Sequence, residues 1–149
     1  MKKVLTALAL VLAASGAQAA QSDMTITSLA TGKTTQSAFN TMAGNHKLPA
    51  WVKKGGTSTP AQEVKLGEDS WQVLESCKPH DCSTERMAVI YSEKTGKMAG
   101  VVSHVNAKGD RENLTWLGDE GSLSIDAKTV LLAALTGSLQ NHPDAFNYQ

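Results

Sequence analysis

The hexapeptide CKPHDC, from Cys77 to Cys82, brings together the residue types of this chain that could do chemistry. It contains both cysteines of the sequence, and between them lie a lysine, a proline, a histidine (His80) and an aspartate (Asp81). Thiols and imidazole bind zinc, a close pair of thiols exchanges electrons, and an imidazole beside a carboxylate can move protons. A ring of this size can also serve as a structural crosslink or as a rigid probe that enters another protein.

The sequence context disfavours the metal, redox and catalytic functions. The best candidate metal ligands are Cys77, His80, Cys82 and, as a fourth, His104. Zinc needs thiolates, however, and in an oxidising compartment two lone cysteines should pair with each other instead. Redox exchange usually employs C-x-x-C at a helix N-terminus, whereas four residues, one of them a proline, separate these cysteines. The sequence therefore predicts neither a metal site nor a redox site.

No catalytic constellation is visible either. The adjacent side chains of His80 and Asp81 point in different directions, so they rarely form a working pair. The chain has no G-x-S-x-G motif, and its acids are scattered, with no two that can be placed opposite each other. We therefore predict that the protein is not an enzyme and needs no cofactor.

The N-terminal segment 1–19 has the three parts of a secretory signal peptide. Two lysines precede an apolar run at residues 4–14, which is too short to anchor the chain in a bilayer, and residues 17–19 have the sequence Ala-Gln-Ala. We expect cleavage after residue 19 and export of a soluble protein to the periplasm, where disulfides form. Cys77 and Cys82 are therefore expected to be paired.

The charge and length of the exported chain exclude some partners and bound the architecture. The full sequence has 14 basic and 14 acidic residues, and loss of Lys2 and Lys3 leaves 12 basic residues against 14 acidic ones, a net charge of about −2. So small and mixed a charge predicts binding neither to nucleic acid nor to a membrane. About 130 residues without repeats or linkers predict a single domain over residues 20–149.

The N-terminal half of that domain has weak structural signals. Residues 20–34 contain few apolar side chains and are expected to be loosely held. Residues 35–44 are predicted to form a short helix that ends at a glycine, and residues 47–60, rich in glycine and proline, are predicted to be irregular. The expected core residues of this irregular segment are Leu48, Trp51 and Val52.

From residue 61 the pattern changes to strands. The predicted strands cover residues 61–67, 69–77, 86–92, 98–105 and 114–118. A turn, EKTGK, separates the third strand from the fourth, and its glycine suits a positive φ, so these two strands are predicted to form a hairpin. Because the strands follow one another as a meander, we expect antiparallel pairing.

A final helix is predicted after the strands. Ser124 or Asp126 can cap its start, and His142-Pro143 should end it. Its apolar face comprises Val130, Leu131, Ala134, Leu135 and Leu139. The two aromatic residues of the following AFNY segment are expected to dock on the domain. The predicted fold is therefore α+β, with a central antiparallel sheet of about five strands sandwiched by helices.

The remaining histidines favour structural interpretations. His46 and His142 lie beside loop breakers and are expected at the surface. His104 is close to Val102 and Val105 in a predicted strand, so it is expected to be an ordinary sheet residue with its polar atoms satisfied. None of the spacings matches a motif such as H-E-x-x-H.

The residues alone leave a crosslink and a probe as alternatives for the ring. Closing a six-residue ring stabilises a fold by about 2 kcal/mol, against about 4–5 kcal/mol for a hundred-residue loop. A small ring is better at fixing shape, because Pro79 locks its own φ and biases Lys78 toward extended backbone, while Asp81 can bond to nearby backbone. A rigid protrusion with His80 near its tip could enter a concave site with little loss of entropy.

The ring and its flanking sequences resemble the Ivy family of periplasmic inhibitors of vertebrate (C-type) lysozyme. The similar segments are LPAWV at 48–52, CKPHDC at 77–82, RMAVIYSEKTGK at 86–97, TWLG at 115–118 and SIDAKTVLLAALTGSLQNHPDAFNY at 124–148. Together they cover most of the chain that follows the signal peptide. The resemblance implies a central antiparallel sheet with helices on its faces, and an exposed, disulfide-closed loop that enters the lysozyme cleft.

The resemblance also assigns roles within the loop. It implies that Cys77 and Cys82 are the bridging cysteines and that His80 reaches both catalytic carboxylates of the enzyme. The other residues of this inhibitory loop are Lys78, Pro79 and Asp81. The chemistry is consistent, because lysozyme keeps one carboxylic acid protonated and one aspartate ionised. A neutral imidazole can accept from the first and donate to the second, whereas a lysine could only donate.

Other functions stay open from the sequence. The partner could be a lytic transglycosylase of the same cell, which also has a carboxylic acid in a peptidoglycan cleft. The chain could instead be a periplasmic structural protein with a disulfide-stapled loop. Monomer and homodimer are both compatible with the sequence, and Asp81 could bond within the loop or touch the enzyme.

Overall fold

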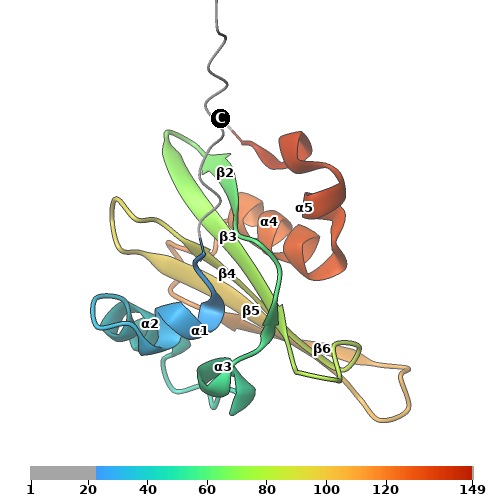
Figure 1. Cartoon of the computed structure of the whole chain (residues 1–149). Helices are drawn as coiled ribbons and strands as arrows, with labels where there is room; N and C mark the ends of the chain where they lie inside the picture. The colour runs from blue at the N-terminus through green and yellow to red at the C-terminus, as the bar shows by residue number, and fades with distance from the viewer. Residues whose placement is uncertain (1–22, 149) are drawn as a thin grey trace, which may run out of the picture.

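Three short helices precede the sheet in the computed structural model, which describes residues 23–148 (Figure 1). Helix α1 spans Ile26–Thr31, α2 spans Gln36–Ala43 and α3 spans Trp51–Lys54. The signal peptide predicted for residues 1–19 lies outside the described residues.

For the described part of residues 20–34, helix α1 shows that the prediction of a loosely held segment was wrong. The hydroxyl of Thr25 accepts the N–H of Ser28 at 3.0 Å, and the hydroxyl of Ser28 accepts the N–H of Thr25 at 2.9 Å, which completes a capping box. Ile26 and Leu29, three residues apart on one helical face, are fully buried. Three buried apolar residues thus suffice to hold this short, capped helix.

The next two helices agree in part with the sequence. Helix α2 confirms the helix predicted over residues 35–44, and Gly44 ends it with a φ of 54°. The segment 47–60, predicted to be irregular, contains the single turn α3. Trp51 and Val52 are buried as predicted, and Leu48 is partly buried against the same core.

The described residues form one antiparallel sheet of six strands. Their bounds are Thr57–Ser58 (β1), Gln62–Leu66 (β2), Asp69–Cys77 (β3), Glu85–Tyr91 (β4), Met98–Val105 (β5) and Glu112–Leu117 (β6). The order is β1-β3-β4-β5-β6, and β2 pairs with β3 as well. All five predicted strands are present, and the two-residue strand β1 was not foreseen.

The β4–β5 hairpin is confirmed. Gly96 has a φ of 70° in its turn, and its N–H donates to the carbonyl of Ser92 at 2.8 Å. At the opposite end of the sheet lie two further connections, residues 78–84 between β3 and β4 and residues 106–111 between β5 and β6.

Helix α4 spans Ile125–Thr136, and the hydroxyl of Ser124 caps it by accepting the N–H of Ala127 at 3.1 Å. The predicted continuous helix up to His142 is wrong, because Gly137 adopts a left-handed conformation with a φ of 77° and ends α4. A short helix α5, Ser138–Asn141, and a 3₁₀ turn η1, Pro143–Phe146, follow.

The C-terminal aromatic residues dock as predicted. Phe146 and Tyr148 are partly buried against the core that α4 covers. The N–H of Tyr148 donates to the carbonyl of Lys65 at 2.9 Å, and its carbonyl accepts the N–H of Gly67 at 2.6 Å. The last described residue is therefore tied to the edge of β2.

Helices α1, α2 and α3 lie on one side of the sheet and α4 and α5 on the other (Figure 1). The sheet separates two hydrophobic cores, one under each group of helices. Side chains of one strand alternate between these cores, so Leu74 and Met87 belong to the first, while Val73 and Ala88 belong to the second. This arrangement confirms the predicted α+β fold with a sheet sandwiched by helices. No helix among residues 23–148 is both long and apolar enough to cross a membrane.

Candidate functional site

The CKPHDC loop projects from the end of the sheet as part of the connection between β3 and β4. Cys77 and Cys82 form a disulfide with their Cα atoms 4.8 Å apart, which confirms the predicted pairing. Because these are the two cysteines of the sequence, no thiolate is left to bind a metal or to attack another disulfide.

The four residues from Lys78 to Asp81 form a tight turn. The N–H of Asp81 donates to the carbonyl of Lys78 at 3.0 Å, and His80, the third residue, has a φ of 63°. Pro79 holds the second residue at a negative φ. A negative φ followed by a positive one defines a type II β-turn, in which the third position usually belongs to glycine or asparagine.

His80 is therefore strained and exposed at the same time. It is the one non-glycine residue with a positive φ among residues 23–148, and it lies at the surface. A left-handed backbone costs an L-residue about 1–2 kcal/mol. Such strain persists where the surroundings impose it, and here the disulfide and the turn hydrogen bond do so.

The charges next to His80 neutralise each other. The ammonium of Lys78 lies 3.0 Å from a carboxylate oxygen of Asp81, so the Asp81 side chain bonds within the loop. The side chain of Thr84 and then the Lys78 ammonium lower the pKa of Asp81, and the Asp81 carboxylate raises the pKa of Lys78. The exposed imidazole thus stands beside a closed ion pair.

Glu85, the first residue of β4, joins the base of the loop to helix α3. Its carbonyl accepts the N–H of Lys78 at 3.0 Å, and its carboxylate accepts the indole N–H of Trp51 at 2.7 Å. His104, opposite Glu85 in β5, lies 3.6 Å from the same carboxylate and is more than half exposed. The prediction of His104 as a sheet residue is confirmed, with a carboxylate as its neighbour.

The close packing at the base of the loop leaves no room for a side chain at position 56, which is occupied by Gly56. A Cβ atom there would lie 2.9 Å from the ring of Trp51 and 3.0 Å from the carbonyl oxygen of Cys77. Trp51 therefore sits against the backbone that carries the disulfide.

Arg86, the next residue of β4, anchors the loop on the opposite face of the sheet. Its Nε donates to the carbonyl of Cys82 at 2.7 Å, and its Nη1 donates to the carbonyl of Leu135 in the last turn of α4 at 2.6 Å. A cation at the C-terminal end of a helix also interacts favourably with the helix dipole. Burial raises the pKa of nearby Glu75, and the Arg86 guanidinium partly offsets that rise.

Sequence reasoning did not identify Glu85 and Arg86 as parts of the site. The available signal was their position, because they are two charged residues that open an otherwise apolar strand shortly after the ring.

Comparison with known proteins decides the family. Residues 34–131 match the family model described as Inhibitor of vertebrate lysozyme (Ivy). The chain belongs to the Ivy family. The Inhibitor of vertebrate lysozyme of Escherichia coli (strain K12) is 57% identical over 148 residues, which cover 99% of this chain and 93% of that protein. The resemblance inferred from CKPHDC and its flanking segments is thereby confirmed.

Two further relatives of this Ivy-family chain match over shorter stretches. An uncharacterised protein of Yersinia pestis is 46% identical over 50 residues, 33% of this chain and 32% of that protein. The Inhibitor of vertebrate lysozyme of Pseudomonas aeruginosa is 35% identical over 49 residues, 32% of each chain. The family and its named members are inhibitors and not enzymes, which agrees with the prediction from the sequence.

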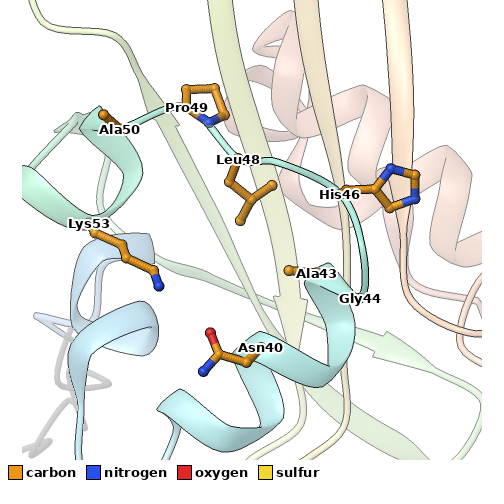
Figure 2. Close-up of a pocket in the computed structure, with 8 residues that line it drawn as sticks. All are labelled: Asn40, Ala43, Gly44, His46, Leu48, Pro49, Ala50 and Lys53. Atoms are coloured by element: carbon orange, nitrogen blue, oxygen red, sulfur yellow. The ribbon is translucent and has the colours of Figure 1, made fainter.

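Other side chains that could do chemistry lie apart from the CKPHDC loop. His46 and His142 are exposed, as predicted. A hollow of about 380 Å³ lies between α2 and α3. Figure 2 shows that the side chains of Asn40 and Lys53 extend toward each other, whereas the ring of His46 points away from both of them. The polar side chains that line this hollow are exposed, so it has no buried polar group that could hold a ligand. Within residues 23–148, no three His, Cys, Asp or Glu side chains are grouped to hold a metal ion.

Proposed function

We propose that this chain is a periplasmic inhibitor of C-type lysozyme whose CKPHDC loop enters the active-site cleft of the enzyme. His80 then contacts both catalytic carboxylates. The observation that carries the proposal is the exposed imidazole of His80, held at the third position of a disulfide-closed type II turn in a member of this family.

The imidazole matches the ionisation of its proposed target. Lysozyme holds one carboxylic acid protonated and one aspartate ionised. The N–H of a neutral imidazole donates to the ionised aspartate, and its other nitrogen accepts from the protonated acid. The ion pair between Lys78 and Asp81 favours entry of the loop, because it leaves neither charge to be buried unpaired beside His80.

Rigidity supports tight binding. The disulfide, the turn hydrogen bond and the anchors at Glu85 and Arg86 fix the loop before it meets a partner. A pre-ordered loop avoids the entropy loss that a flexible loop would suffer on entering a narrow cleft. Because the loop would occupy the position of the scissile bond, inhibition is expected to be competitive with substrate.

The proposal includes the maturation of the chain. Residues 1–19 are removed on export, and residues 20–149 act as one inhibitor domain. The disulfide is consistent with this location, because crosslinks of this kind form in the bacterial periplasm and are rare in the cytosol.

The positive φ of His80 allows a sharper test than an alanine replacement alone. His80→Ala removes the imidazole and keeps the backbone strain, whereas His80→Gly removes both, because glycine adopts a positive φ freely. Both variants should raise the inhibition constant for a C-type lysozyme at least about tenfold. In thermal or urea unfolding, the Gly variant should be about 1 kcal/mol more stable than the Ala variant.

The comparison of targets completes this test. The purified mature domain is titrated against lysozyme and, in parallel, against a lytic transglycosylase. If both His80 variants inhibit lysozyme as well as the unmodified protein does, the imidazole is not the contact. If lysozyme is not inhibited and the transglycosylase is, the partner is an enzyme of the cell itself. If neither enzyme is inhibited, the loop is a structural crosslink.

A further inference from the structure

A groove of about 280 Å³ lies directly beside the disulfide loop, on the sheet face that α4 covers. We call it the Leu114–Leu132 groove. Its walls are Ser83 of the β3–β4 connection, Val105 at the end of β5, Leu114 of β6, and Leu132 and Leu135 of α4. The polar groups at its floor are engaged, because Arg86 donates to two carbonyls and the hydroxyl of Ser103 donates to Glu112.

The two leucines that name the groove are exposed. Leu114 is 38% exposed and Leu132 is 39% exposed, and they are two of the three exposed large apolar side chains in the described residues. The third, Ile125, is at the other end of α4, about 10 Å away along the helix axis. Neighbouring apolar side chains at the surface indicate a site of protein interaction more than isolated ones do.

The loop alone is too small to form a stable inhibitory interface. Inhibitor complexes of standard size bury about 800 Å² on each partner and use about 20–30 residues a side. The connection 78–84 supplies seven residues, of which His80 and Ser83 are exposed and the other five are partly buried. A partner that accepts the loop must therefore also cover surface beside it.

The groove is continuous with the loop and fixed to it. Ser83, which directly follows Cys82, lines the groove, and the N–H of Val105 in the groove wall donates to the carbonyl of Thr84 at 2.8 Å. Arg86 ties the carbonyl of Cys82 to that of Leu135, so α4 on the far wall is linked to the disulfide as well. The loop and both walls of the groove therefore present one rigid surface.

Glu112 sets the charge of this surface. It is exposed, it accepts the hydroxyl of Ser103, and it has no ion pair within residues 23–148. A carboxylate at the rim of an apolar groove fits a basic side chain that neighbours an apolar one.

We propose that the Leu114–Leu132 groove is a second contact with the enzyme whose cleft the loop enters. It receives an apolar side chain from the rim of that cleft, and Glu112 pairs with a basic neighbour of that side chain. This inference rests on the proposed function, because the partner is the same enzyme.

The test compares matched substitutions on one helix. Leu132→Gln and Ile125→Gln each replace an exposed apolar side chain of α4 with a polar one of similar length, but only Leu132 lines the groove. We expect Leu132→Gln to raise the inhibition constant about tenfold, mainly through faster dissociation, and Ile125→Gln to change it less than about twofold. The melting temperatures of both variants should stay within about 2 °C of the unmodified protein.

Glu112→Gln tests the charge separately. The amide oxygen can still accept from Ser103, so the local structure is kept. We expect slower association and a weaker dependence of association on salt, because a rim charge acts mainly on the encounter rate.

His80→Gly in the same series separates the two proposals. If His80→Gly abolishes inhibition while Leu132→Gln and Glu112→Gln bind as the unmodified protein does, the groove proposal is overturned and the loop proposal stands. If His80→Gly inhibits fully, the loop proposal itself fails. Light scattering of each variant tests whether a second copy of this chain occupies the groove instead. If the unmodified protein is a dimer, and Leu132→Gln dissociates the dimer without changing inhibition, the second copy is the occupant and the groove proposal is overturned.

Discussion

Glu85 and Arg86 are consecutive residues that hold the same loop from opposite faces of the sheet, and they do so differently. The Glu85 side chain accepts the indole N–H of Trp51 and so joins α3 to the sheet below the loop. The Arg86 side chain donates to the carbonyl of Cys82 and so grips the ring itself, while a second bond reaches α4. Alternation along a strand makes this possible, because neighbouring side chains point to opposite faces.

The two side chains therefore have different roles: that of Glu85 supports the packing of α3, and that of Arg86 holds the disulfide ring in place. Removing the Glu85 carboxylate affects how α3 packs, whereas removing the Arg86 guanidinium frees a carbonyl of the disulfide ring and another at the end of α4. We therefore expect that the CKPHDC loop can be loosened from the face that carries Arg86 without loss of the core on the face that carries Glu85.

The largest effect is expected from Arg86→Met. The substitution keeps a long apolar side chain but leaves the carbonyls of Cys82 and Leu135 without their charged donor, at a cost of about 2–3 kcal/mol in urea unfolding. Inhibition should weaken as well, because the ring becomes mobile. Arg86→Lys is the control and should recover part of both losses, since an ammonium can reach one of the two carbonyls. Equal stability of the Met variant and the unmodified protein would contradict this role for Arg86.

A smaller effect is expected from Glu85→Gln. The amide oxygen still accepts the indole N–H of Trp51, so only the charge is lost, and unfolding should be easier by about 1 kcal/mol. The inhibition constant should change less than about twofold, because the bonds of the loop to Glu85 are made by its backbone. If inhibition fell as far as in the Arg86 variant, the contrast between the two faces would be lost.

The smallest effect concerns the ion pair at the loop tip. The pKa of Asp81 is lowered in the folded protein, so the stabilisation from its carboxylate is present above its ordinary value of 3.8 and is lost as the pH falls through the lowered value. The pKa of Lys78 is raised, so its part is present below 10.5 and is lost only as the pH rises through the raised value. We expect the loop to stay unchanged between these limits and to loosen in acid.

Amide exchange of the loop measures this directly. Exchange at Asp81, whose N–H closes the turn, should accelerate below pH 3.8 in the unmodified protein. In Asp81→Asn the exchange, corrected for its intrinsic pH dependence, should not vary across this window. A similar acid response in both proteins would mean that another group controls the turn.

The sequence predicted those elements that depend on interactions between residues close together in the chain. The alternation in RMAVIYS and MAGVVSHV and the glycine between them sufficed for the β4–β5 hairpin, and Ser124 was identified as a possible cap of α4. The polar segment around Ile26 and Leu29 was misjudged, because the burial of those two side chains depends on a sheet that lies far along the chain. The end of α4 at Gly137 was also missed, since a glycine inside an apolar helical pattern does not by itself indicate a left-handed backbone conformation.

The sequence by itself determined the pairing of the two cysteines, the antiparallel meander of the five longer strands and the family, because all of these depend on residue types and short spacings. Only the tertiary structure decided that His80 occupies a glycine-like position, that Arg86 joins the ring to a carbonyl 49 residues away, and that Leu114 and Leu132 border one groove. The reason is physical. A contact between distant segments is set by how whole elements pack, and no local pattern around either residue carries that information.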